Sequence, residues 1–361
     1  MTTMAAVHVD DRPPAPHAPR RGTWHLTWHG LRTVAQLELR QRVRSTRWIV
    51  ALIVWFVVVG GLTLLITGVV TRDETGFDTG RGPLLFGAVT YLVLGLGLLV
   101  TPTLTSTAIN GDRSAGTLAT LQVTLLSPAE IAVGKLLAAW AAACAFLVIS
   151  VPFLLLAMSM GGTPATSLVR VVLVLALVLI AICGIGLGFS ALVSRAAGST
   201  VLTFIAVSAL VLLTPALFGL TYAQISGTAS VQVWGPPAQD YDAPCELHTE
   251  IRSVDHTERT WWLLGINPFV VTADAAGTRG NDNDPLGAIR NGVRDLRQGP
   301  TILDECYYGD DAPAPIASGD SAPIWPWGLG TDLALGAAGV VVAVRRLTIP
   351  SRKLARGTRV A

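Results

Sequence analysis

Six long apolar runs constrain this chain more than any other feature of its sequence. A helix rises ~1.5 Å per residue and the hydrocarbon core of a bilayer is ~30 Å thick, so about 20 apolar residues in a helix cross it. Backbone groups in lipid must bond within their own segment, which favours helices over open strands. The runs occupy residues 48–70, 83–109, 136–160, 171–193, 201–220 and, shorter and richer in glycine, 327–344. We therefore predict six membrane-spanning helices.

The composition excludes most classes of soluble protein. Of the 361 residues, 51% are hydrophobic and only 14% are charged, and the mean hydropathy is +0.54. Soluble domains average about 25% charged residues, so a chain this long with so few could not cover its surface in water. The net charge of +2 gives no basis for a nucleic-acid partner. The sequence predicts an all-α polytopic membrane protein, with the lipid bilayer as its surroundings.

Basic residues at the two ends predict the orientation of the spans. Eight arginines precede residue 48, and six Arg or Lys residues follow residue 344. Positive flanks stay on the cytoplasmic side, so both termini are expected there, which an even number of spans requires. The segment 221–324 would then be extracytoplasmic; it carries fifteen Asp or Glu against six Arg. Only two of the basic residues are lysines, which indicates a high-GC bacterial source, so the expected location is a bacterial plasma membrane.

The segments around the spans have separate predicted roles. Residues 1–30, with several prolines and no apolar core of a signal peptide, are expected to form a disordered cytoplasmic tail. Residues 31–47 mix spaced apolar residues with arginines, which predicts an amphipathic helix lying on the headgroups. Spans one to five fill residues 48–220, span six fills residues 325–346, and residues 347–361 form a basic cytoplasmic tail.

The four cysteines divide between two environments. Cys144 and Cys183 lie in apolar runs and are expected to be packing residues. Cys245 and Cys306 lie in the outer segment, where thiols oxidise, and we predict a disulfide between them. His248 and His256 follow Cys245, but their spacing fits no familiar metal site, so no metal is expected.

The loop between the second and third runs has the most informative local pattern. Asp112 can accept hydrogen bonds at a helix start, and leucines at i, i+3 and i+7 predict a short amphipathic helix over residues 112–126. Ser127, Pro128 and Glu130 then form the pattern of a capping box, which predicts a new helix directly behind it. From these residues alone, the short helix either rests on lipid or docks on a cytoplasmic partner.

The same loop resembles the permease motif of type-2 ATP-binding-cassette (ABC) exporters. The resemblance rests on Asp112-Arg113, Gly116-Thr117-Leu118, Leu121, Leu126-Ser127-Pro128 and Gly134-Lys135, with Ser114 in place of a second acid. Asn267-Pro268-Phe269 and the layout of six spans add to it. The resemblance implies a coupling helix, seated on a separate cytoplasmic ATPase, that carries the residues Asp112, Arg113, Gly116, Thr117, Leu118, Leu121 and Leu125. It also implies a second permease copy or a paralogue, alternating access, and small re-entrant helices between spans five and six, for which residues 261–276 are the candidate.

The chain itself carries no recognisable motif for chemistry. A phosphate-binding loop needs Gly-x-x-x-x-Gly-Lys-Ser/Thr, whereas the single Gly-Lys pair, Gly134-Lys135, is followed by Leu136. The sequence contains neither His-Glu-x-x-His nor Gly-x-Ser-x-Gly. We therefore expect no catalytic residues and no cofactor in this chain, with ATP and Mg²⁺ bound by the partner ATPase.

Two features inside the spans stand out, one for transport and one for packing. Asp332 is the one acid within a predicted span; it could line a transport pathway, be solvated at the interface, or pair with Arg170 at the outer end of span four. Gly184 and Gly188 form a small-x-x-x-small pair that predicts close helix packing.

The resemblance thus implies the permease subunit of an ABC transporter, an exporter, and the aliphatic spans predict a hydrophobic or amphipathic cargo. Two alternatives stay open. One is a polytopic scaffold, sensor or immunity protein that transports nothing. The other is an ion-coupled secondary transporter, although such proteins normally contain several buried charges and an inverted repeat.

Overall fold

The computed structural model describes residues 22–72, 81–116, 126–236, 245–278, 284–299, 302–306 and 322–348. Within these residues, six stretches are helical, long and apolar enough to cross a bilayer. The predicted multi-span membrane protein is confirmed. The spanning helices are α2 (Thr46–Arg72), α3 (Arg81–Thr105), α6 (Pro128–Ser159), α7 (Ala165–Leu192), the fifth span α8 (Ala196–Ser208) with α9 (Thr214–Ile225), and α13 (Trp325–Leu347).

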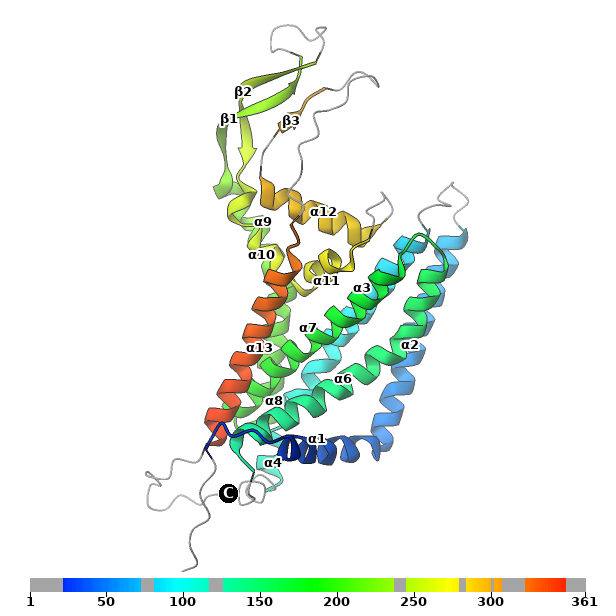
Figure 1. Cartoon of the computed structure of the whole chain (residues 1–361), viewed down its shortest axis with the longest axis vertical. Coiled ribbons are helices and arrows are strands. Elements are labelled where there is room, and N and C mark those ends of the chain that lie inside the picture. Colours follow the sequence, from blue (N-terminus) through cyan, green and yellow to red (C-terminus); the bar gives the residue numbers. More distant parts are fainter. Residues whose placement is uncertain are drawn as a thin grey trace, which may run out of the picture.

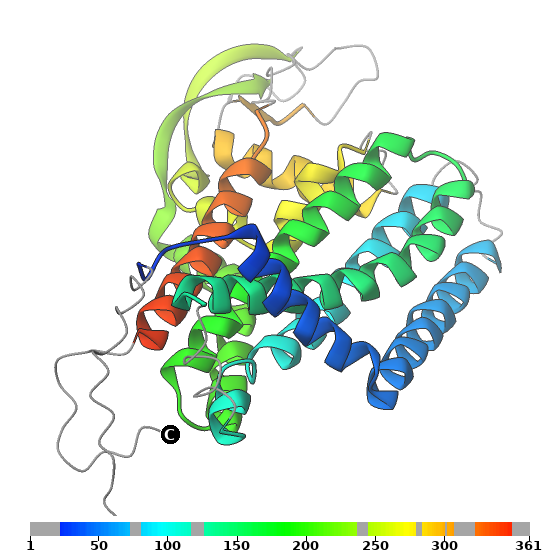
Figure 2. The ribbon, with the colours of Figure 1, turned by 60° about the horizontal axis from the view of Figure 1, so that its bottom comes forward.

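The two ends of the helical bundle differ in character (Figure 1). At one end, here called the basic end, helix α1 (Trp28–Val43) lies across the spans, beside the short helix α4 (Asn110–Ser114) and the last turn of α13 with Arg345 and Arg346. At the other end, here called the sheet end, a small sheet and several short helices project beyond the bundle. Figure 2 shows α1 crossing the spans from the side of the basic end.

The centre of the bundle is the contact between α7 and α13. A Cβ atom added to Gly184 would lie 2.8 Å from the Cα atom of Gly336, and one added to Gly188 would lie 2.6 Å from the Cα atom of Gly339. Only glycine lets two helix backbones approach this closely, which is the packing mode of small-x-x-x-small pairs. The predicted packing role of Gly184 and Gly188 is confirmed. Cys183, beside this contact, is a free and buried thiol.

Helix α2 stands at the edge of the bundle and presents an apolar face outward. Ile53, Val57 and Leu65 are more than half exposed, which suits a helix whose outer face meets lipid hydrocarbon. Its inner face is fixed by Trp55, whose Nε1 donates to Ser150 Oγ of α6 at 2.9 Å. The Trp55 ring also packs against Phe146.

The fifth span contains a wide turn at Ala209–Leu213, a π-helical segment between α8 and α9. Pro215 has no N–H, so the carbonyl of Val211, four residues earlier, loses its usual helical donor. Asn267 replaces that donor, because its Nδ2 donates to Val211 O at 2.9 Å and to Thr214 Oγ1 at 3.1 Å. The Asn267-Pro268 pair therefore ties the segment after the fifth span back to the irregular turn inside it.

The segment between the fifth and sixth spans corrects the all-α prediction. It contains a three-stranded sheet in the order β2-β1-β3, in which β1 (Ser226–Gly235) pairs antiparallel with β2 (Glu246–Asp255) and parallel with β3 (Ile302–Asp304). Alternation explains the strands, since Val231 and Val233 of β1 are buried together with Val254 of β2. The chain then forms η2 (Thr257–Arg259), α10 (Trp262–Gly265), α11 (Pro268–Ala276) and α12 (Pro285–Gln298).

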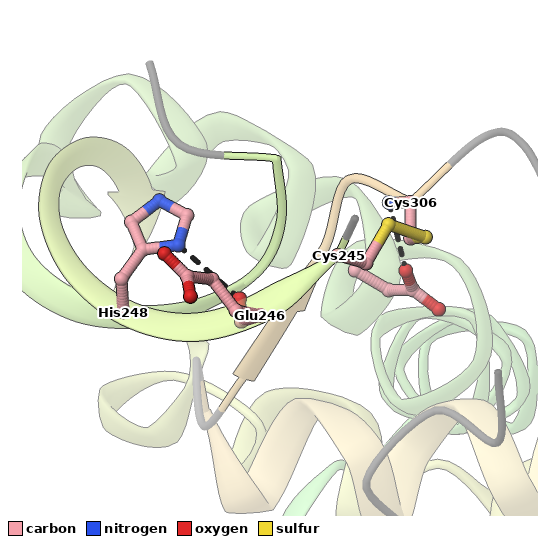
Figure 3. The surroundings of a disulfide bond; sticks show 5 residues. Cys245, Glu246, His248 and Cys306 are labelled. Atoms are coloured by element: carbon pink, nitrogen blue, oxygen red, sulfur yellow. Dashed lines mark hydrogen bonds between the residues drawn. A yellow bond between two sulfur atoms is a disulfide. The ribbon is translucent and has the colours of Figure 1, made fainter. Parts of the chain in front are cut away.

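The predicted disulfide joins the residue before β2 to the segment directly after β3 (Figure 3). Cys245 and Cys306 are bonded, with their Cα atoms 6.1 Å apart, so this prediction is confirmed. Beside it, Arg252 donates from Nε and Nη2 to the two carboxylate oxygens of Glu305, at 2.9 and 3.0 Å. These hydrogen bonds hold the pKa of Glu305 below its usual value. The disulfide also removes Cys245 from any metal site with His248 or His256.

Residues 261–276, the re-entrant candidate, form two short helices, α10 and α11, separated at Asn267. Asp274 of α11 is buried and accepts hydrogen bonds from the backbone N–H groups of Ile324 and Trp325, at 2.6 and 2.8 Å. It also accepts from Arg294 Nε of α12 at 2.7 Å. A single carboxylate thus caps the start of α13 and joins it to α11 and α12. Re-entry into the bilayer stays a prediction.

Candidate functional site at the basic end

The basic end brings helix α1 together with the two helices that flank the predicted coupling loop, α4 and α6. Helix α1 packs against the first turns of α6, since a Cβ atom on Gly134 would lie 2.6 Å from Cβ of Val34. Helix α4 enters the loop and α6 leaves it. We call the residues that join these segments the basic-end junction: Thr27, Glu38, Asp112, Glu130 and Lys135.

The start of α6 has a reciprocal cap. Ser127 Oγ accepts from the Glu130 backbone N–H at 3.1 Å, and Glu130 Oε2 accepts from the Ser127 backbone N–H at 2.8 Å. Pro128 occupies the first helical turn, where a missing N–H costs no hydrogen bond. This is the arrangement that the sequence pattern predicts for Ser127, Pro128 and Glu130.

The same cap also binds the segment before α1, which the sequence pattern did not indicate. The second carboxylate oxygen of Glu130 accepts from the Thr27 backbone N–H at 2.9 Å and from the Thr27 hydroxyl. Ser127 Oγ donates to the carbonyl of His25. Because Glu130 is fully buried, each of its bonds is shielded from water. The start of α6 and the start of α1 are therefore held as one unit.

Lys135 occupies the middle of the junction. Its side chain is 1% exposed, and its ammonium contacts Glu38 Oε1 of α1 and, at 2.7 Å, Asp112 Oδ2 of α4. A buried ammonium is stable only when it is paired, so the two carboxylates are what allow Lys135 to lie there. One side chain of α6 thus joins the helix before the loop to the helix across the basic end.

Hydroxyl groups fix the corner between α3 and α4. Ser190 Oγ of α7 accepts from the backbone N–H groups of Ile109 and Asn110, at 3.0 and 3.2 Å. Ser199 of α8 donates to the carbonyl of Ser106 at 2.8 Å. These bonds satisfy polar backbone groups where α3 ends, so the entry to the loop has a defined position.

The predicted helix over residues 112–126 is wrong at its start. Helix α4 begins at Asn110, so Asp112 lies inside it and pairs with Lys135 instead of capping it. Among the described residues, helix α4 ends at Ser114, and Gly116 has a φ of +71°, a left-handed conformation that favours glycine and ends helices. The remaining predicted coupling residues, Thr117, Leu118, Leu121 and Leu125, lie outside the described residues.

Arg113 differs from its neighbour in its surroundings. Asp112 is bound within the junction, whereas Arg113 has no ion pair with the part of the chain that the structure describes. Its guanidinium is therefore open to an acidic group from outside these residues. The two neighbouring charges of the motif therefore differ in their partners: Asp112 pairs with Lys135, whereas Arg113 forms an ion pair with none of the described residues.

Asp332, the second predicted site residue, lies fully buried in α13. Neither of its carboxylate oxygens has a hydrogen-bond partner among the described residues. The expected alternative of a pair with Arg170 is not what the described residues show, because the Arg170 guanidinium packs against Gly277, at the end of α11. The structure does not bring Asp332 and Arg170 together.

Comparisons with known proteins add no relative. No protein-family model matches the chain, and no curated protein matches its sequence.

Proposed function

We propose that this chain is the membrane-spanning subunit of an ABC-type exporter, driven by a separate ATPase that docks on the loop after the second span. In this proposal the basic end is cytoplasmic and the sheet end is extracytoplasmic. ATP and Mg²⁺ are bound by the partner, and this chain supplies the pathway. A second copy or a paralogous permease completes that pathway, and the cargo is hydrophobic or amphipathic.

The observation that carries the proposal is the basic-end junction. The loop that resembles a coupling motif is anchored on both sides: Lys135 and Ser190 hold its entry, and the cap at Ser127 and Glu130 holds its exit. Because Lys135 and Glu130 also bind α1 and the residues before it, a push on the loop must move α1 and α6 together. Transmission of force from the loop to the spans needs a rigid connection between them, so that movement of the loop can switch the bundle from one arrangement to the other.

Co-purification tests the proposed docking. Leu118 and Leu121 would meet the ATPase through apolar contacts, so the double substitution Leu118→Asp and Leu121→Asp places two charges in that contact. We expect it to lower the amount of bound ATPase at least tenfold. The measurement co-expresses the tagged chain with an ATPase from a neighbouring reading frame that carries Gly-x-x-x-x-Gly-Lys-Ser/Thr.

The matched control carries the same two changes at the sheet end, at Leu247 and Ile251, which are 46% and 70% exposed. It should retain the ATPase. Equal retention by the loop variant, with both variants inserted in the membrane, would contradict docking on the loop.

Ion-coupled secondary transport is the second candidate, and Asp332 is the observation that favours it. A fully buried carboxyl group with no hydrogen-bond partner among the described residues is a typical position for a proton or cation in transport. We expect Asp332→Asn to lower transport while leaving membrane insertion intact. Transport that follows an imposed proton gradient without ATP, and stops in this variant, would select the second candidate. Transport that needs ATP and ignores the gradient would reject it.

A further inference from the structure

A groove of about 460 Å³ lies in the elbow where α1 turns into α2. Its walls come from the end of α1, the start of α2, the end of α3 and Phe146 of α6. None of these residues belongs to the basic-end junction. The groove therefore needs an explanation of its own.

One side of the groove is cationic. Arg42 and Arg47 both line it, together with the hydroxyl groups of Ser45, Thr103 and Thr107. Arg42 uses one donor on the carbonyl of Leu104, where Nη2 lies 3.0 Å from the oxygen, and this leaves the other donors of its guanidinium for a ligand. Within the described residues Arg47 has no acidic partner.

Burial makes an anion more favourable at this position. Arg42 is half-buried, and desolvation holds the pKa of its guanidinium below the usual value, although Glu38 opposes the effect. Arginine stays protonated at neutral pH even so, which leaves a partly desolvated positive charge. Planar guanidinium groups and hydroxyls are the groups that proteins use to bind phosphate.

The other side of the groove is apolar. Trp48, Ala51, Val100, Leu104 and Phe146 supply hydrocarbon surface directly beside the arginines. Helix α1 crosses the end of the bundle while α2 runs along it (Figure 2). If α2 spans the bilayer, the groove at their elbow lies at the depth where headgroups meet acyl chains. Tryptophan is the side chain most typical of that depth. A soluble anion would leave this apolar wall uncovered.

We propose that this groove binds one anionic phospholipid, with its phosphate on Arg42 and Arg47 and an acyl chain along the apolar wall. The charge of the arginines selects an anionic headgroup over a zwitterionic one. The adjoining hydrocarbon surface selects a lipid over a free phosphate ion. The site is distinct from the loop that the proposed ATPase would contact, and it does not depend on that function.

The experiment measures lipid retained by the purified full chain. The chain is equilibrated in an equimolar mixture of phosphatidylglycerol and phosphatidylcholine, and the bound lipids are counted by native mass spectrometry. We expect one strongly retained phosphatidylglycerol in the unmodified chain. The double substitution Arg42→Gln and Arg47→Gln should lower the affinity for phosphatidylglycerol at least about tenfold. Each basic residue near anionic lipid contributes about fivefold in affinity, and the variant removes two of them.

Arg40 near the end of α1 and Arg44, the residue directly after that helix, provide a matched control. Both are exposed and neither lines the groove, so Arg40→Gln with Arg44→Gln removes the same charge without touching the site. A second variant, Ala51→Trp, fills the groove without changing any charge and should also release the lipid. It keeps the test decisive if loss of the Arg42 bond to Leu104 disturbs folding.

Three outcomes would overturn the proposal. Equal loss of phosphatidylglycerol from the control and the test variant would reduce the effect to general attraction. Retention in both the arginine variant and Ala51→Trp would place the lipid elsewhere. Displacement of the lipid by millimolar inorganic phosphate would show that the site takes a free ion.

Discussion

Replacing Lys135 with alanine is expected to be among the most damaging single changes at the basic end. The change leaves Glu38 and Asp112 facing one another without the ammonium that joins them. Removing one partner of a buried ion pair costs about 3–5 kcal/mol. We expect the lower end of that range, because the two carboxylates keep 19% and 25% exposure and can gain water. Thermal unfolding of the purified chain measures the effect as a lower melting temperature.

Two controls separate loss of the ion pair from general disturbance. Arg113→Ala removes a neighbouring cation that has no partner among the described residues, and it should leave the melting temperature nearly unchanged. Adding Glu38→Gln and Asp112→Asn to Lys135→Ala should recover part of the loss, since no unpaired charge then remains. An unchanged melting temperature in Lys135→Ala would show that the junction does not hold α1, α4 and α6 together.

Replacing Gly184 with valine is expected to separate α7 from α13. The added Cβ atom alone would lie 2.8 Å from two backbone atoms of Gly336, which is closer than real Cβ atoms approach. Overpacking a core costs about 1–3 kcal/mol when side chains can move, and here the obstacle is a helix backbone. We therefore expect more than that, seen as loss of the monodisperse peak in size-exclusion chromatography.

Gly61 of α2 is the matched control for this substitution. It is also a glycine in a spanning helix, but nothing lies within 4 Å of a Cβ atom placed there. Gly61→Val should elute as the unmodified chain does. A normal elution profile for Gly184→Val would mean that the two helices do not approach as closely as the structure has them.

The spans could be predicted from the sequence because the bilayer acts on length and hydropathy alone. The close packing at Gly184 and Gly188 could also be predicted, because their spacing places two small residues on one face of a helix. The sheet was missed although Val231 and Val233 alternate with polar residues. Charged residues on β2 made the segment resemble an irregular loop, and the pairing of β1 with β3 joins residues far apart in the chain.

The basic-end junction shows the same division between local and distant signals. The cap at Ser127 and Glu130 spans four residues, so the pattern that predicts it is complete within the sequence. The bond from Lys135 to Glu38 joins residues separated by 97 positions, and no local pattern specifies it. Lys135 itself gave a signal that could have been used. A lysine at the start of an apolar run, where α6 enters the bundle, needs an acidic partner.

Photo-crosslinking from Leu121 in intact cells tests the central claim most directly. A photoreactive amino acid at this position should give an adduct with an ATPase whose sequence carries Gly-x-x-x-x-Gly-Lys-Ser/Thr, while the same group at Leu247 on the sheet end should give none. An adduct of that kind from Leu247 but not from Leu121, or labelling of residue 121 by a reagent that cannot cross the membrane, would contradict the account.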